Sequence, residues 1–312
     1  MNKPSAVIDK SLFHELCKIP DSNARENLWQ ELHNNYQLVV PLILIEETVA
    51  NAVQPGTKPT SEVQRLVDEV ASHSSCWLED MYEIAFAELV GGKPLSTLPA
   101  LSHPVASEIL QLRWDDESLK AHVQQRKQDS RATHDQWKAE QNRLTAAALT
   151  TELKNEGELF NVVLANFLPR LKEPAQKNEM LETILGNPFR RRHKESANAI
   201  DDAFSRFTPE TFTKYYVSLT CINCRLAFFF APIYTLPGSS SKERLRFLRQ
   251  DQNNFYDAEY VSSALICERF LTRDEQQARM CHVFKLAQYW KGEVVFVSPK
   301  QDISTALPKA LV

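Results

Sequence analysis

Acidic side chains lie at the ends of apolar, strand-like segments, one group near each end of the chain. These residues are Asp9, Glu47 or its neighbour Glu46, Asp257 and Asp274. The carboxyl ends of parallel strands share one edge of an open α/β sheet, and ligands bind in the crevice there. Carboxylates gathered at that edge need a cation, and oxygen ligands suit Mg²⁺ or Mn²⁺. The chemistry most often performed by such a site is hydrolysis of phosphodiester bonds.

The segments that position these carboxylates alternate between strand-like and helical patterns. Apolar, strand-like runs lie at 6–8, 38–45, 270–273 and 293–297, and helical patterns separate them. This alternation predicts an α/β fold with a central, mostly parallel sheet flanked by helices.

Taken in order, these motifs resemble the PIN-like nuclease family. The matching segments are Ala6-Val7-Ile8-Asp9-Lys10-Ser11, Val39-Val40-Pro41 before a helix with Glu47, Asp257-Ala258-Glu259-Tyr260, and Phe270-Leu271-Thr272-Arg273-Asp274 with its Thr-x-Asp signature. The resemblance covers residues 1–60 and 235–312. It implies a Rossmann-like fold and metal-dependent hydrolysis of RNA, which is favoured over DNA as the substrate. By analogy with the family, toxins and defence effectors are the contexts to test first. It assigns metal binding and catalysis to Asp9, Glu47, Asp257 and Asp274.

The sequence leaves open which of two adjacent glutamates joins the site and what two further glutamates do. Glu46 and Glu47 are about 100° apart on a helix, so only one of them can face the other carboxylates. In the family the acidic residue commonly falls six positions after the equivalent of Pro41, which favours Glu47. Glu259 and Glu268 are candidates for additional ligands or for groups that support the ligands, although Glu268 is equally consistent with a solvated surface residue.

Hydroxyl groups beside the acidic residues are candidates to orient them. Ser11 is placed to bond to Asp9, and Thr272 to orient Asp274 or to bind a metal-bound water. A purely structural interpretation competes with this one. Asp257 is favoured in a first helical turn by the helix dipole, and Asp274 is a suitable N-cap for the helix that follows.

Two turn-rich segments divide the chain. Residues 54–60 and 236–241 are rich in Pro, Gly, Ser and Thr, and almost everything between them has a helical pattern. We therefore expect a split PIN-like domain formed by 1–58 and 236–312, interrupted by an all-helical insertion over 59–235. A large insertion of this kind is a candidate surface for a protein partner.

The net charge of −4 means that a nucleic acid would have to be bound by a local basic patch. Two clusters of cations are candidates for contacts with a phosphate backbone. The first is Arg190, Arg191 and Arg192, in the helical insertion. The second is Lys242, Arg246 and Arg249, which recur at helical spacing before Asp257.

The remaining features bound the class of protein. Cys221 and Cys224 form a single C-x-x-C, and core packing explains this pair better than zinc does. The longest apolar region, 215–233, contains Asn223 and Arg225, so we expect no membrane span and a cytoplasmic protein. The alternative to a nuclease is a helical interaction or regulatory protein, built on a PIN-like scaffold without catalysis.

Overall fold

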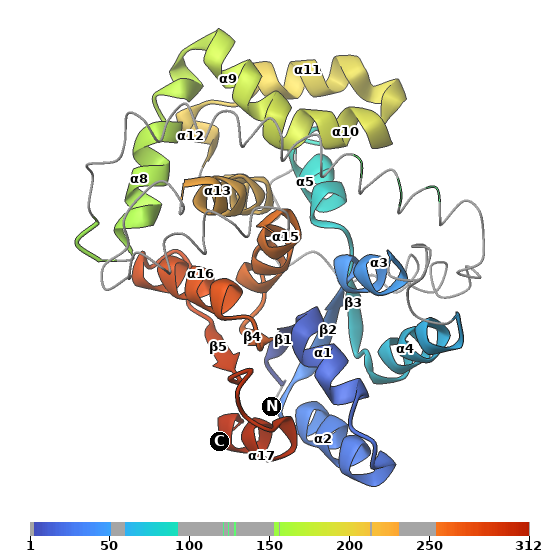
Figure 1. The fold of residues 1–312 in the computed structure, drawn as a ribbon. Coiled ribbons are helices and arrows are strands. Elements are labelled where there is room, and N and C mark those ends of the chain that lie inside the picture. Colours follow the sequence, from blue (N-terminus) through green and yellow to red (C-terminus); the bar gives the residue numbers. More distant parts are fainter. Residues whose placement is uncertain are drawn as a thin grey trace.

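A five-stranded parallel sheet forms the centre of the protein in the computed structural model (Figure 1). The structure describes residues 3–50, 60–92, 153–155, 157–212, 214–230 and 254–311, with three isolated positions between 121 and 128. The strands are β1 (Ser5–Ile8), β2 (Gln37–Pro41), β3 (Cys76–Leu78), β4 (Arg269–Thr272) and β5 (Glu293–Phe296). All of their pairings are parallel and their order is β3-β2-β1-β4-β5, which confirms the α/β class.

The central strands are buried on both faces. Val7 of β1 pairs in register with Val39 of β2 on one side and with Phe270 of β4 on the other, and all three side chains are inaccessible to solvent. Strands covered by helices on both faces of a parallel sheet have nearly continuous apolar sequences. This is why β1 and β4 are recognisable as short apolar runs.

Four helices alternate in the chain with the strands β1, β2 and β3. They are α1 (Lys10–Cys17), α2 (Ser22–Asn35), α3 (Leu42–Ala50) and α4 (Thr60–His73). The apolar run over 38–45 is not one strand, because β2 ends at Pro41 and residues 42–45 form the first turn of α3. A proline lacks the N–H that would continue the strand ladder, and its fixed φ suits the start of a helix.

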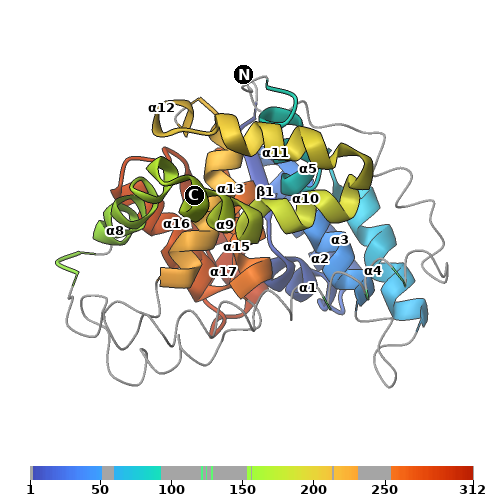
Figure 2. The same cartoon turned by 90° about the horizontal axis from the view of Figure 1, so that it is seen from above.

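A layer of helices lies above the sheet, with α13 (Tyr216–Phe230) packed against α5, α8 and α15 (Figures 1 and 2). Its other helices are α5 (Met81–Leu89), α8 (Glu158–Phe167), α9 (Pro174–Leu181), α10 (Asn187–Arg192), α11 (Ala197–Arg206) and α12 (Pro209–Phe212). Short 3₁₀ segments at Arg170–Lys172 and Lys194–Ser196 and a π-helical segment at Glu182–Gly186 join them. After this layer the chain returns to the sheet through α15 (Asn254–Leu265), α16 (Glu275–Leu286) and α17 (Ile303–Ala310), which packs against α2.

Strand β3 corrects the expected domain boundaries. Cys76–Leu78 lies inside the region 59–235, which we expected to be an all-helical insertion, yet it pairs in parallel with β2. The residues after 58 therefore complete the central sheet before the helical layer begins. A three-residue strand is too short to show a period in the sequence, which is why the pattern missed it.

One hydrophobic core joins the helical layer to the sheet. The buried carboxylate of Glu88 on α5 accepts hydrogen bonds from the backbone N–H of Ser218 (2.7 Å) and from its hydroxyl (2.8 Å), at the start of α13. Negative charge at a helix N-terminus is stabilising, so this contact fixes α13 against α5. Both thiols of the C-x-x-C, Cys221 and Cys224, lie on α13 and are buried in this core. Among the described residues, no helix is both long and apolar enough to cross a membrane.

Candidate functional site

The candidate site lies where the strand order changes direction. From β1 the chain builds the sheet outwards through β2 and β3, and it later returns to place β4 on the other side of β1. Open α/β sheets bind ligands outside the carboxyl ends of the strands at such a switch point. Asp9 directly follows β1, and Asp274 follows β4 by two residues. Two of the expected carboxylates therefore lie at the switch point.

Asp9 is almost completely buried, with 1% of its surface exposed. One carboxylate oxygen accepts a hydrogen bond from the N–H of Leu12 (2.9 Å), so Asp9 is the N-cap of α1. The other accepts from the hydroxyls of Ser11 (2.6 Å) and Thr272 (2.7 Å). Burial raises the pKa of Asp9 to about 6 despite these three donors, and the charge of Asp274 adds to the shift. Keeping this carboxylate ionised in the folded protein therefore costs free energy.

Thr272 connects the two strand-end carboxylates. Its hydroxyl donates to Asp9, and the same oxygen accepts a hydrogen bond from the backbone N–H of Asp274 (2.9 Å). The side chain of Asp274 accepts from the backbone N–H groups of Gln276 (2.8 Å) and Gln277 (2.9 Å), which makes it the N-cap of α16. Asp9 and Asp274 are therefore both helix N-caps, and both also belong to the group of neighbouring carboxylates.

Asp257 comes from α15 and joins this cluster through a glutamine. The amide nitrogen of Gln277 donates to Asp257 Oδ1 (2.8 Å), while the backbone N–H of Gln277 bonds to Asp274. Burial raises the pKa of Asp257 well above its ordinary value, and the charges of Asp274, Glu47 and Asp9 raise it further. These carboxylates lie close enough to repel one another, so the site attracts a cation.

Glu47 of α3 is held by two groups. The hydroxyl of Tyr260 donates to one of its carboxylate oxygens (2.9 Å), and the ammonium of Lys10 lies 3.3 Å from the other. Tyr260 is on the same helix as Asp257, three positions later, so α15 faces the site with both side chains. Burial and the neighbouring carboxylates, Glu47 foremost, raise the pKa of Tyr260, which therefore stays a donor.

We use the term carboxylate cluster for Asp9, Glu47, Asp257 and Asp274. All of its possible metal-ligand atoms are oxygens, which suits Mg²⁺ or Mn²⁺. Within the described part of the chain, no three acidic, histidine or cysteine side chains are placed to hold an ion together, so binding would require some of the carboxylates to turn. One further observation fits a ligand here: Oε1 of Gln277 has no hydrogen-bond partner, although the residue is only 5% exposed. A buried acceptor without a donor is rare and needs an explanation.

Other expected acidic residues lie elsewhere. Glu46 is buried one position before Glu47 on α3. Glu259 forms an ion pair with Arg225 between α15 and α13 (2.8 Å), with both side chains buried. Glu268 precedes β4 and accepts from the N–H of Ser5 (2.9 Å), at the amino edge of the sheet and away from the cluster. The fold therefore does not bring Glu268 to the other carboxylates.

Two of the three arginines expected to form a basic patch on α10 pair with carboxylates. Arg190 bonds to Glu182 (2.9 Å) and to Asp201 (2.6 Å). Arg192 pairs with Asp80 (2.8 Å) and also with Glu83. These two arginines are cross-links of the helical layer, which argues against the phosphate-binding role we expected for them. The side chain of Arg191 and the cluster of Lys242, Arg246 and Arg249 lie outside the described residues.

Three residues of the site were not expected as participants from the sequence. Lys10 and Tyr260 belong to segments that resemble the PIN-like family, but the sequence predicts no role for either side chain. It predicts none for Gln277 either. Helical spacing was the available signal, because Tyr260 follows Asp257 by three positions and Gln277 follows Asp274 by three. That signal is weak, since any amphipathic helix contains many such pairs.

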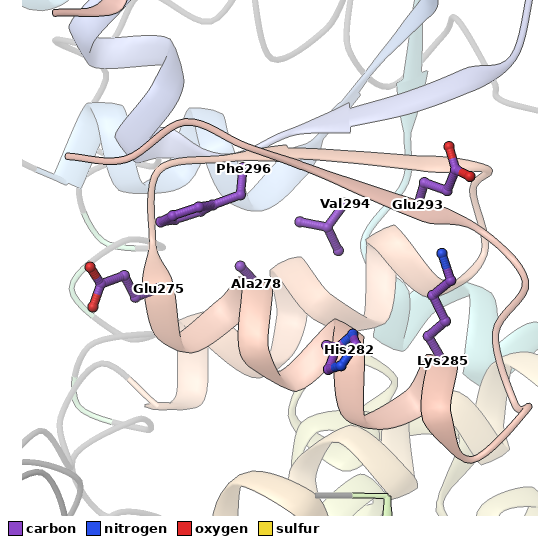
Figure 3. Close-up of a pocket in the computed structure, with 7 residues that line it drawn as sticks. All are labelled: Glu275, Ala278, His282, Lys285, Glu293, Val294 and Phe296. Atoms are coloured by element: carbon purple, nitrogen blue, oxygen red, sulfur yellow. The ribbon is translucent and has the colours of Figure 1, made fainter. Parts of the chain in front are cut away.

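A separate hollow of about 490 Å³ lies between α16 and the edge strand β5 (Figure 3). Figure 3 shows Ala278, His282 and Lys285 on the helix facing Val294 and Phe296 on the strand. The lining contains none of the four clustered carboxylates and mixes acidic, basic and apolar groups. Its chemistry indicates no particular ligand.

Comparison with known proteins assigns no family to this geometry. No known family, no curated protein and no solved structure matches the chain. Function is therefore inferred from the chemistry of the carboxylate cluster and from its place in the sheet.

Proposed function

We propose that this protein is a metal-dependent nuclease of the PIN-like type, which hydrolyses phosphodiester bonds, with RNA as the first substrate to test. The observation that carries the proposal is the carboxylate cluster at the switch point of the sheet. Burial and mutual repulsion raise the pKa of Asp9 and of Asp257 there. Structural ion-pair networks also shift pKa values, but shifts caused by burial together with neighbouring carboxylates, at the switch point of an open sheet, are typical of a functional site.

Asp9, Asp257 and Asp274 are the residues best placed to hold Mg²⁺ or Mn²⁺, with Glu47 beside them. A divalent ion at such a site lowers the pKa of a water molecule and stabilises charge on the leaving oxygen. Ser11 and Thr272 fix the orientation of Asp9, and Tyr260 fixes that of Glu47. Groups that orient metal ligands commonly affect both metal affinity and activity.

The test is cleavage of labelled total RNA, single-stranded DNA and double-stranded DNA by the purified protein with Mn²⁺, with Mg²⁺ or with a chelator. We expect metal-dependent cleavage of RNA. Asp257→Asn should lower the rate by orders of magnitude, because it removes a charge that holds the cation while keeping the volume of the side chain.

A matched control is Asp202→Asn on α11, where Asp202 forms an exposed ion pair with Arg206. This change removes the same charge in the helical layer and should leave cleavage unchanged. If the parent protein cuts none of the three polymers in either metal, the nuclease proposal is refuted. A protein that then binds partners through its helical layer would fit the alternative of a scaffold without catalysis.

A further inference from the structure

Lys10 is a cation in direct contact with the carboxylate cluster, through Glu47. Within the described residues, the pair of Lys10 and Glu47 is the only ion pair made by any of the four clustered carboxylates. The lysine side chain is 28% exposed and that of Glu47 is 18% exposed, so solvent reaches the pair. Four carboxylates that repel one another require positive charge, and in this structure an ammonium group supplies part of it.

We propose that Lys10 is a tethered cation of this site, which a divalent metal displaces from Glu47 and which then binds a phosphate of the substrate. The proposal rests on the proposed function for the identity of the substrate, but not for the competition between lysine and metal. No covalent step is involved, because one ion pair replaces another.

Geometry supports displacement over permanent pairing. Lys10 follows Asp9 directly and begins α1, so its backbone is fixed by the N-cap while its long side chain can turn outwards. Glu47 does not depend on the lysine alone, because Tyr260 bonds to its other oxygen. Gln277 supplies an independent sign of a ligand nearby, since its buried Oε1 lacks a partner beside Asp257. Glu47 can therefore exchange Lys10 for a metal without losing its orientation.

The positive charge of Lys10 explains why it would then bind a phosphate of the substrate. Once a divalent ion takes the place of the ammonium, the lysine has no carboxylate partner in the cluster, and its backbone position keeps it beside Asp9. A phosphodiester that approaches the metal carries the complementary charge, and a lysine binds phosphate as a flexible point charge. Lys10 is then a residue that binds substrate, while Tyr260 only positions Glu47.

The experiment measures Mn²⁺ affinity by calorimetry for the parent protein, Lys10→Met, Lys10→Arg and Lys18→Met. Removing one competing charge at a partly buried site should tighten Mn²⁺ binding by about tenfold at low salt. Lys10→Arg keeps the charge and should bind Mn²⁺ like the parent. Lys18→Met is the matched control, because Lys18 pairs with Glu15 at the exposed end of α1 and its side chain is 64% exposed.

RNA cleavage at saturating Mn²⁺ is the second measurement. Lys10→Met should lower kcat/KM and flatten the dependence of KM on salt, since it loses about one phosphate contact. Unchanged or weaker Mn²⁺ binding in Lys10→Met overturns the inference even if the parent cleaves RNA. A parent that binds Mn²⁺ but cleaves no nucleic acid refutes the proposed function alone, and the affinities of the variants still decide whether Lys10 competes with the metal. A parent that binds no Mn²⁺ overturns both.

Discussion

Asp9→Asn should make the metal-free protein more stable at neutral pH. Burial in the fold raises the pKa of Asp9 from its ordinary value of 3.8 to about 6. The folded state therefore binds the proton more tightly than the unfolded chain, and ionisation of Asp9 destabilises the fold as the pH rises from below 4 to above 6. Asparagine resembles the protonated acid in shape and carries no charge, so it avoids this penalty.

The magnitude follows from the shift. The interval from 3.8 to about 6 corresponds to about 3 kcal/mol, at about 1.4 kcal/mol for each pH unit. Asparagine also presents an NH₂ group where the hydroxyls of Ser11 and Thr272 now donate, and reorienting those hydroxyls costs about 1 kcal/mol. We expect Asp9→Asn to gain about 2 kcal/mol at pH 7 and to lose that gain as the pH falls towards 4.

Urea denaturation in chelator, followed by tryptophan fluorescence between pH 4 and pH 8, measures the difference. Asp302→Asn is the control, because Asp302 caps α17 at an exposed position and its hydrogen bonds to Ser304 lower its pKa. That variant should be no more stable than the parent at pH 7. An Asp9→Asn protein that is less stable than the parent at pH 7, or whose gain is the same at pH 4, would refute the reasoning. In that case the carboxylate of Asp9 acts as a stabilising cap.

Two further changes test the contacts that hold the site and the helical layer. Thr272→Val removes the donor to Asp9 and the acceptor of the Asp274 N–H, so it should lower the free energy of unfolding by about 1–3 kcal/mol and reduce cleavage. Thr272→Ser keeps the hydroxyl and should retain most of the stability and of the cleavage. A valine variant with parental stability and activity would contradict this role. Arg225→Met should cost about 3–5 kcal/mol, because it leaves the buried Glu259 without its cation. Adding Glu259→Gln should recover part of that loss, and a double-mutant cycle without coupling would show that the pair does not act as a unit.

The sequence by itself determined the local elements and the residues that end them. Short apolar runs specify β1 and β4, because strands buried on both faces have few polar residues. Asp9 and Asp274 specify helix starts, because their side chains can satisfy the first N–H groups of α1 and α16. Each of these features depends on residues that are neighbours in the chain, so the sequence displays them directly.

Some features expected from local patterns were decided differently by contacts distant in sequence. A run of three arginines suggested a free basic patch, but the carboxylates that pair with Arg192 lie 112 and 109 positions away. Cys76–Leu78 carried no strand signal of its own, and it became β3 because β2 offered a partner edge. Pairing of this kind depends on where separate segments pack, which local periodicity does not encode.

The properties of the site belong to the tertiary structure. The hydroxyl of Thr272 meets the carboxylate of Asp9 across 263 positions, because β4 returns to lie beside β1. Burial is produced by all the segments that cover a group, and electrostatic repulsion by all the charges near it. The sequence therefore supplied four carboxylates with suitable chemistry. Only the fold decided that they lie close enough to repel one another, that Gln277 links two of them, and that Lys10 pairs with Glu47.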